Sequence, residues 1–544
     1  MSKKAPQKPK KAEQNTPQSA LFNRIDFLLA ALAGLLALTL YARTLAPGVL
    51  PVDSGEFQVL VHQMGLAHTT GYPIYILLAK LFITLVPFAS LAYEVNLFSA
   101  LMGAVTVAAV YLSARLLSGS AWAALVAALA LTVSYTLWSQ AVIAEVYAPG
   151  AAFVATVWLL VLVWYKTGSK RALFAAGLCG GLGLGVHGSL SVAALAVGVF
   201  LLLNWKRWQA FWRPALLGGL LGVAFYVVAF FALDRYAPPA NIFHASYGPA
   251  RSAWGLSEAD IQNPVKRVWF NLSAGQWQGR MFVDPGEDMP ENTEQYLDNL
   301  GREFSPWMLG AALLGLVIVF VIDWRVGAFF LTAFVLHLVF YFNYRVGDQY
   351  VFFIPTYMWM SMLAAVALGT LTWFFPEEQR SAIGQVPGRV VRVALHVITA
   401  LVILFIGVLP VLTPHWPAVQ QGKLPFLNDP DYVVDATFNL SYEQVRLVMK
   451  ELEPDAILFQ SWPLLYPYWY VALIEQGRTD LRFIEQNPYH ESTDFPASSV
   501  EFIRANLDEH PIYLADYQAE VVRAGFRLHS VHMGFAQFYK VEKP

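Results

Sequence analysis

The chain has 544 residues, of which 57% are hydrophobic and only 14% are charged. Soluble globular proteins usually carry about 25% charged residues, so the composition excludes an ordinary soluble enzyme and predicts a polytopic α-helical membrane protein. The formal net charge of -2 gives no reason to expect nucleic acid as a partner, and the single cysteine, Cys179, excludes an intrachain disulfide.

Residues 1–20 are polar and carry a group of lysines, Lys3, Lys4, Lys8, Lys10 and Lys11. Such a segment cannot bury enough apolar surface to fold, so it is predicted to be a disordered basic tail. With the apolar run that follows, it superficially resembles a signal peptide. The run from Ile25 to Leu40 has no clear small-residue cleavage site, however, and is long enough to stay in the membrane as an anchor.

Apolar runs then predict a membrane domain over residues 21–412 with about eleven spans. The predicted spans are 25–43, 92–114, 121–138, 148–165, 172–187, 189–204, 214–233, 307–322, 326–343, 350–374 and 393–412.

The segment Tyr72–Phe88 decides the topology, because it is apolar but has Lys80 at its middle. If it spans, the basic residues of the short loops, such as Arg115 and Arg325, fall outside the cell, against the positive-inside rule. We therefore predict a re-entrant or interfacial helix, a cytoplasmic N-terminus and an extracytoplasmic C-terminus. The long outer loops are then 44–91 and 234–306, and the expected location is the inner (plasma) membrane.

This topology gathers acids, histidines and tyrosines on the outer face, while the basic residues collect on the other. The predicted outer set is Asp53, Glu56, His62, His68, Glu145, Tyr147, His187, Asp348 and Tyr350. A cluster of this kind, with little lysine or arginine beside it, suits a cation, a general base or a hydroxyl-rich ligand.

Asp53 and Glu56 are the most informative members of this set, because on a helix they share one face. A like-charged pair raises one pKa, which is useful for general acid–base catalysis. Alternatively, Asp53 binds a divalent cation, Mg²⁺ or Mn²⁺, through its oxygens. The third possibility is an ordinary solvated helix start.

Other candidates also have two interpretations each. His68 either binds a phosphate or hydroxyl or is structural, and the Gly71-Tyr72-Pro73 sequence next to it predicts a tight turn into an apolar helix. His187 lies in a glycine-rich run that suits either helix packing or a site. Arg345 either holds a lipid phosphate or pairs with Asp348.

Residues 413–544 change to a mixed, more polar composition. Strands are predicted at 456–460, 482–485, 511–515 and 534–541, with helices at 442–451 and 462–476. This alternation predicts a small extracytoplasmic α/β domain that recognises the acceptor or caps the membrane site.

Several motifs, taken in order, resemble one family of bacterial and animal membrane proteins that was long catalogued only as a domain of unknown function. The motifs are Tyr41-Ala-Arg-Thr-Leu-Ala-Pro-Gly, Asp53-Ser-Gly-Glu, His68-x-x-Gly-Tyr-Pro, Val95-Asn-Leu-Phe-Ser-Ala, Trp138-Ser with Glu145-Val-Tyr, Gly183-Leu-Gly-Val-His, and Asp348-Gln-Tyr-Val-Phe-Phe-Ile-Pro. The family is similar to the GT-C superfamily of multi-pass glycosyltransferases, and an animal member is a protein O-mannosyltransferase. Thr69-Thr70 departs from the two prolines common at that place.

The resemblance implies a GT-C-like fold and transfer of a monosaccharide from a polyprenyl-phosphate-linked donor to a hydroxyl of a protein or glycan acceptor, outside the bilayer. It implies that Asp53 is the catalytic base or a metal-linked acid, with Glu56 second and Glu145 as the second-loop acid. The substrate-binding residues expected with them are His68, Tyr72, Tyr147, His187, Arg345, Asp348 and Tyr350.

Two other function classes are open. A transporter or flippase of lipid-linked sugars usually shows internal repeats and charges near the bilayer midplane, whereas this sequence has no evident repeat and its acids lie at one face. A scaffold that binds partners through residues 413–544 is the third class.

Overall fold

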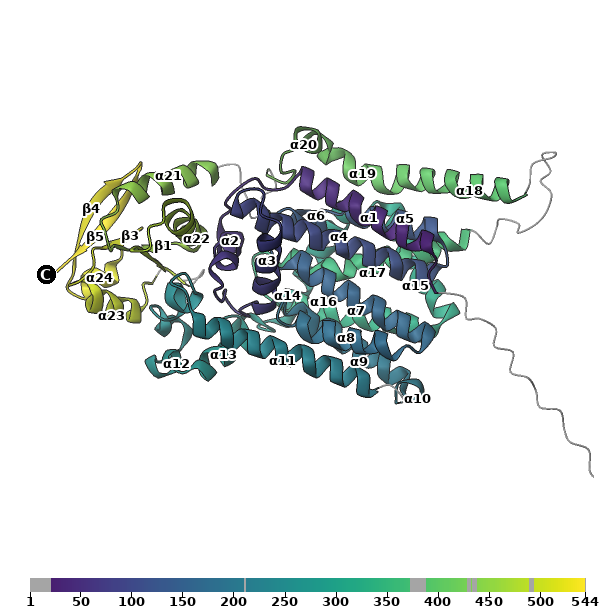
Figure 1. The fold of residues 1–544 in the computed structure, drawn as a ribbon, viewed down its shortest axis with the longest axis horizontal. Helices are drawn as coiled ribbons and strands as arrows, with labels where there is room; N and C mark the ends of the chain where they lie inside the picture. Colours follow the sequence, from purple (N-terminus) through teal and green to yellow (C-terminus); the bar gives the residue numbers. More distant parts are fainter. Residues whose placement is uncertain are drawn as a thin grey trace, which may run out of the picture.

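The computed structural model describes residues 21–209, 212–371, 388–427, 432, 438–488 and 494–543. Its helices form an elongated bundle with a β-sheet at one end, and α2 (Val52–Gln63) and α3 (Pro73–Leu85) lie at the end of the bundle that faces the sheet (Figure 1). The predicted tail, residues 1–20, lies outside the described residues.

The remaining helices of the bundle and its loops are α1 (Arg24–Arg43), α4 (Leu91–Ser118), α5 (Ala121–Thr132), α6 (Tyr135–Ala141), α7 (Tyr147–Thr167), α8 (Lys170–Gly183), α9 (Ser189–Leu203), α10 (Trp205–Trp208), α11 (Trp212–Tyr236), α12 (Glu258–Gln262), α13 (Pro264–Leu272), α14 (Pro285–Glu303), α15 (Pro306–Ile322), α16 (Trp324–Phe342), α17 (Ile354–Thr370), α18 (Gly388–Ile403), α19 (Leu409–Leu412) and α20 (Trp416–Gln421).

The prediction of eleven spans is not confirmed. Among the described residues, seven helices are long and apolar enough to cross a membrane, or nine if each of two bent helix pairs counts as one span. Every predicted range does contain a helix, but α8 has 14 residues and α9 has 15. A transmembrane helix needs about 20 residues, and neither of these two helices reaches that length.

Tyr72–Phe88 forms α3, which has 13 residues. At 1.5 Å per residue it reaches about 20 Å, less than the roughly 30 Å hydrocarbon core, so its length agrees with a re-entrant or interfacial helix. Gly71 precedes it with φ +80°, and Pro73 is its first residue, as expected for a tight turn into a helix.

The glycine-rich run before His187 serves helix packing. A Cβ on Gly181 of α8 would lie 2.6 Å from the backbone oxygen of Gly219 on α11, and one on Gly218 would lie 2.1 Å from that of Phe174. These glycines allow α8 and α11 to touch through their backbones. His187 itself lies beyond the end of α8.

The C-terminal sheet has the strand order β2-β1-β3-β5-β4. The strands are β1 (Ile457–Gln460), β2 (Arg482–Glu485), β3 (Ile512–Leu514), β4 (Arg527–Met533) and β5 (Ala536–Glu542), and the helices around them are α21 (Phe438–Glu451), α22 (Trp462–Tyr470), α23 (Ala497–Asn506) and α24 (Ala519–Arg523). Strands β2, β1 and β3 are parallel, and β5 pairs antiparallel with β3 and β4. Four of these strands lie at the predicted ranges; β4 was not predicted.

Helix α22 packs directly on α2, and Gly55 lies at this contact. A Cβ there would lie 2.5 Å from the backbone oxygen of Leu50 and 3.3 Å from Cδ of Pro467. This contact brings the segment after β1 against the Asp53-Ser54-Gly55-Glu56 motif, so the site described next is built from both ends of the chain.

Candidate active site

A cavity of about 400 Å³ lies where α2, the segment before α3 and the ends of several bundle helices meet. Its polar lining comes from four distant stretches of sequence, namely Asp53, His68 and Tyr72; Tyr147; His187; and Tyr344 with Asp348. Its apolar lining includes Leu184, Tyr226, Phe340 and Phe352. Six of the predicted site residues therefore line one cavity, although they are up to about 300 positions apart in the chain.

His68 lies between two carboxylates. Its Nδ1 is 2.6 Å from Oε2 of Glu56, and its backbone N–H donates to Glu56 Oε1 at 2.8 Å. Its Nε2 is 3.7 Å from Oδ2 of Asp53. The Glu56 side chain is fully buried, whereas that of Asp53 is 32% exposed. Glu56 therefore holds the imidazole from behind, and Asp53 faces the cavity.

The charges of this group favour an imidazolium. Burial lowers the pKa of His68, but the negative charges of Asp53 and Glu56 outweigh burial and raise that pKa to about 10. Burial also raises the pKa of Glu56, and the attraction of His68 opposes this. The physical outcome is a buried Glu56–His68 ion pair, in which His68 Nε2 lies 3.3 Å from the Tyr72 hydroxyl and 3.7 Å from Oδ2 of Asp53.

Glu145 is close to this group but does not line the cavity. Its Oε1 accepts a hydrogen bond of 3.1 Å from the Ser54 hydroxyl. Burial, together with the charges of Asp53 and Asp348, raises the pKa of Glu145 well above its usual value. A neutral Glu145 relieves the excess of negative charge around a single imidazolium.

Asp53 has a second partner from the other end of the sequence. The indole Nε1–H of Trp462, in α22, donates to Asp53 Oδ1 at 2.8 Å across 409 residues. Since Oδ1 is engaged by Trp462, Oδ2 is the oxygen that faces His68 and the cavity. No pattern in the sequence indicates Trp462, because a single tryptophan after a short strand is typical of many surfaces.

The opposite wall of the cavity carries Asp348 and two aromatic groups. The Tyr147 hydroxyl donates to Asp348 Oδ2 at 2.7 Å. His187 stacks parallel to Tyr72 with ring centres 6.3 Å apart, and Ser189 lies 2.8 Å from its Nδ1. Burial lowers the pKa of His187 to about 3, so this imidazole is neutral. Its ring forms part of the cavity wall, and its Nδ1 forms hydrogen bonds with Ser189.

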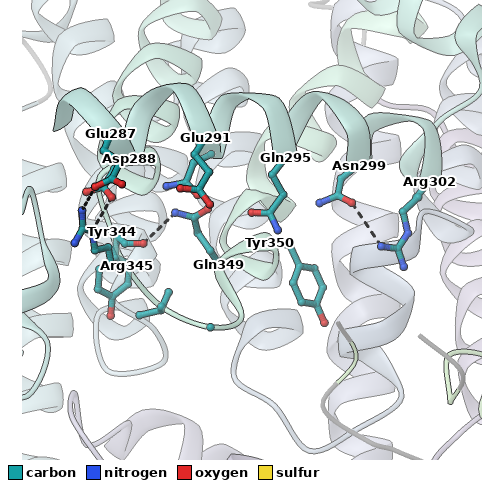
Figure 2. A pocket seen from close by; sticks show the side chains of 13 residues that line it. Glu287, Asp288, Glu291, Gln295, Asn299, Arg302, Tyr344, Arg345, Gln349 and Tyr350 are labelled. Carbon is teal, nitrogen blue, oxygen red and sulfur yellow. Dashed lines mark hydrogen bonds and ion pairs between the residues drawn. The ribbon is translucent and has the colours of Figure 1, made fainter. Parts of the chain in front are cut away.

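Two predicted site residues lie elsewhere, in a neighbouring groove (Figure 2). Arg345 does not pair with Asp348; its Nε is 2.6 Å from Oδ1 of Asp288 on α14. Tyr350 lies in the same groove, with its hydroxyl 3.4 Å from the Gln140 amide nitrogen. Arg345 and Tyr350 therefore do not line the Asp53 cavity, because successive residues of 344–350 face two different cavities, and their role in substrate binding stays a prediction.

Sequence reasoning missed other lining groups, among them Trp277 and Tyr344. Trp277 lines the Asp53 cavity, and the Arg280 guanidinium lies 5.4 Å from the centre of its ring. Loop 234–306 carries several tryptophans and arginines, a combination that suits an interface belt, sugar stacking or a phosphate headgroup. No pattern in the sequence could distinguish Trp277 from the rest.

A divalent cation at Asp53 finds little support in the side chains. Among the described residues, no group of three histidine, cysteine, aspartate or glutamate side chains is arranged to hold a metal. Both oxygens of Asp53 already face donors, and Glu56 is committed to His68. The reaction proposed for this site does not use a metal, and dependence on Mg²⁺ or Mn²⁺ stays a prediction.

Part of the chain is similar to known proteins. Residues 53–211 match the family model of the protein O-mannosyl-transferase TMEM260 N-terminal domain. The family resemblance inferred from the motifs is thereby confirmed, and the matched segment contains Asp53, Glu56, His68, Glu145 and His187.

Curated relatives extend this match. The chain is 37% identical over 158 residues to protein O-mannosyl-transferase TMEM260 of Mus musculus, covering 28% of this chain and 22% of that one. It is 22% identical over 536 residues to protein O-mannosyl-transferase tmem260 of Dictyostelium discoideum, covering 87% and 62%. The chain thus spans about a fifth and about three fifths of these relatives' lengths.

Solved structures establish the fold. ArnT from Cupriavidus metallidurans in the apo state superposes with a TM-score of 0.56 at 14% identity, covering 95% of this chain and 98% of that one. The undecaprenyl phosphate-bound form gives 0.54 at 12% identity, with 95% and 97% covered. The oligosaccharyltransferase of Archaeoglobus fulgidus gives 0.51 at 12%, with 94% and 74% covered. The predicted GT-C-like fold is confirmed.

Proposed function

We propose that this protein is a membrane glycosyltransferase that moves a monosaccharide, mannose first among the candidates, from a polyprenyl-phosphate donor to an acceptor hydroxyl outside the bilayer. One observation carries the proposal: the partly exposed Asp53 carboxylate faces the cavity, with a buried Glu56–His68 ion pair behind it. The curated relatives that match the chain are named protein O-mannosyl-transferases, which supports the same reaction class.

In the proposed reaction, Asp53 Oδ2 removes the proton of the acceptor hydroxyl as the hydroxyl oxygen attacks the anomeric carbon. The bond between that carbon and the phosphate oxygen breaks, and its electron pair leaves with the lipid phosphate. A single displacement of this kind inverts the anomeric configuration. His68 Nε2–H and the Trp462 indole orient Asp53 and balance its charge.

The donor is proposed to occupy the rest of the cavity. Leu184, Tyr226, Phe340 and Phe352 supply apolar wall for the first prenyl units. Arg280, which stacks on Trp277 at the edge of the cavity, supplies positive charge for the departing phosphate. The Arg345 guanidinium is bound by Asp288 and Glu287.

A transfer assay tests the proposal directly. The full chain in proteoliposomes is supplied with polyprenyl-phosphate-linked radiolabelled mannose and hydroxyl-bearing acceptors. We expect labelled acceptor and free polyprenyl phosphate in equal amounts. Movement of intact donor across the bilayer without product would instead support the flippase alternative. EDTA treatment followed by Mg²⁺ or Mn²⁺ addition in the same assay tests the predicted metal dependence.

Trp462→Phe tests whether α22 positions the catalytic carboxylate. Phenylalanine keeps most of the packing but removes the indole N–H that Asp53 Oδ1 accepts. We expect kcat to fall about ten-fold, the value of one hydrogen bond of about 1.4 kcal/mol to a charged group, with donor KM within two-fold of wild type. The control is Trp416→Phe in α20, where the side chain is exposed. Equal kcat for both variants contradicts the positioning role.

A further inference from the structure

A second cavity of about 320 Å³ adjoins the one that holds Asp53. It is a groove between one face of α14 and the segment 344–350. Figure 2 shows the polar side chains that line it, Glu287, Glu291, Gln295, Asn299 and Arg302 from α14, with Arg345, Gln349 and Tyr350 opposite.

The groove and the catalytic cavity share a wall. Tyr344 and Val346 line both, and Asp348, between residues that face the groove, lines the catalytic side. A molecule lying along α14 therefore needs only to pass this short segment to bring a hydroxyl near Asp53. The two cavities are suited to two reactants, because one has an apolar half for a lipid and the other is lined mainly by polar groups.

Helix α14, which forms one side of the groove, is held by contacts on its other face. On the opposite side of α14, the Tyr296 hydroxyl lies 2.9 Å from that of Thr356, and the buried Glu303 carboxylate accepts the Thr136 backbone N–H at 3.2 Å. With its other face held by the bundle, α14 presents its groove face in a preformed arrangement, which lowers the ordering cost of binding.

The length and chemistry of the groove favour an extended polypeptide. Residues 287 to 302 extend about 22 Å along the helix at 1.5 Å per residue, which matches six or seven residues of extended chain at about 3.3 Å each. The amides of Gln295 and Asn299 offer both donors and acceptors to a peptide backbone.

Charge selects the kind of peptide. Arg345 neutralises Asp288 and lies 3.4 Å from Glu287. Within the described part of the chain, Glu291 has no ion-pair partner, and its side chain is exposed in the groove. This unpaired carboxylate attracts a basic residue and repels a phosphate, whereas a neutral glycan gains nothing from it.

We propose that the α14 groove binds the acceptor as an extended, hydroxyl-bearing polypeptide segment and that Glu291 selects a lysine or arginine beside the acceptor residue. The inference rests on the proposed glycosyltransferase function, because it assigns the acceptor of that reaction. It adds a site separate from the Asp53 cavity, with its own specificity residue.

The test compares two heptapeptides with a central threonine, one with lysine on both sides of the threonine and one with glutamate at the same two positions. With saturating donor and low salt, we expect the wild-type chain to favour the lysine peptide in kcat/KM about three- to five-fold, the range of one exposed ion pair, and less so in high salt. Glu291→Lys should abolish or reverse this preference while donor KM stays unchanged.

Glu294→Lys is the matched control, because it makes the same charge change on the same helix at an exposed residue outside the groove lining. An equal effect of both variants, or an unaltered preference in Glu291→Lys, overturns the inference. If sugar is transferred to glycans but not to peptides, the proposal that the acceptor is a polypeptide is overturned.

Binding separates this inference from the proposed function. The fluorescent lysine heptapeptide is titrated into the purified full chain without donor, so that no chemistry is needed. We expect weaker binding to Glu291→Lys than to Glu294→Lys. If the peptide binds more weakly to Glu291→Lys than to Glu294→Lys but no sugar is transferred, the proposed function is refuted and the groove assignment stands. If sugar is transferred but the two variants bind the peptide equally, the groove assignment alone is refuted.

Discussion

Asp53→Asn is expected to lower kcat for sugar transfer by at least about 10³-fold, toward the upper end of the range for loss of a general base. Asparagine has nearly the same size and still accepts the Trp462 hydrogen bond, but it cannot take a proton from the acceptor hydroxyl. The measurement is the transfer of labelled mannose to acceptor by purified variant and wild type under saturating donor.

The control for this variant is Asp298→Asn, which removes an exposed carboxylate from α14 and should leave kcat unchanged. Thermal unfolding of the Asp53 variant should stay close to wild type, since the side chain is one third exposed. A rate for Asp53→Asn within ten-fold of wild type would assign the base to another residue.

Glu56→Gln is expected to move the alkaline limb of the pH–rate profile to lower pH by at least one unit. In the wild type the pKa of His68 is raised to about 10 by Asp53 and Glu56 against the effect of burial, so the imidazolium persists through neutral pH. Removing the Glu56 charge lowers the pKa of His68, and the positive charge beside Asp53 is lost at a lower pH.

The same pair makes stability depend on pH. Because the folded-state pKa of His68 lies above its unfolded value of 6.5, its ion pair stabilises the fold fully below about pH 6.5 and is lost as pH rises through about 10. Glu56→Gln should remove this alkaline loss, measured as unfolding temperature against pH. An unchanged profile in both rate and stability would show that His68 is neutral throughout.

At this site, contacts between residues close in sequence could be predicted, whereas contacts between distant residues could not. Asp53, Glu56 and His68 lie within one loop, and their motif and spacing were enough to place them together. The partner of Arg345 was predicted to be Asp348, three positions away, whereas the actual partner is Asp288. That pairing depends on the 112° bend between α14 and α15, which no local pattern encodes.

The same limit applies to the membrane spans and the C-terminal segment. Every predicted span contains a helix, but hydropathy did not show that α8 and α9 have only 14 and 15 residues. Period-two patterns found four strands, but β4 alternates exposed and half-buried residues without a clear apolar face. Trp462 could not be predicted as a partner of Asp53, since tertiary packing alone brings them together across 409 residues.

The packing of α22 on α2 has a consequence for how the protein matures. Asp53 emerges early in synthesis, but the indole that holds it is made 409 residues later. The nascent chain must therefore complete membrane insertion and deliver its last segment to the same side before the carboxylate is correctly oriented. Truncated or misinserted chains are left without this contact, so the enzyme is expected to gain full activity only when its biogenesis is complete.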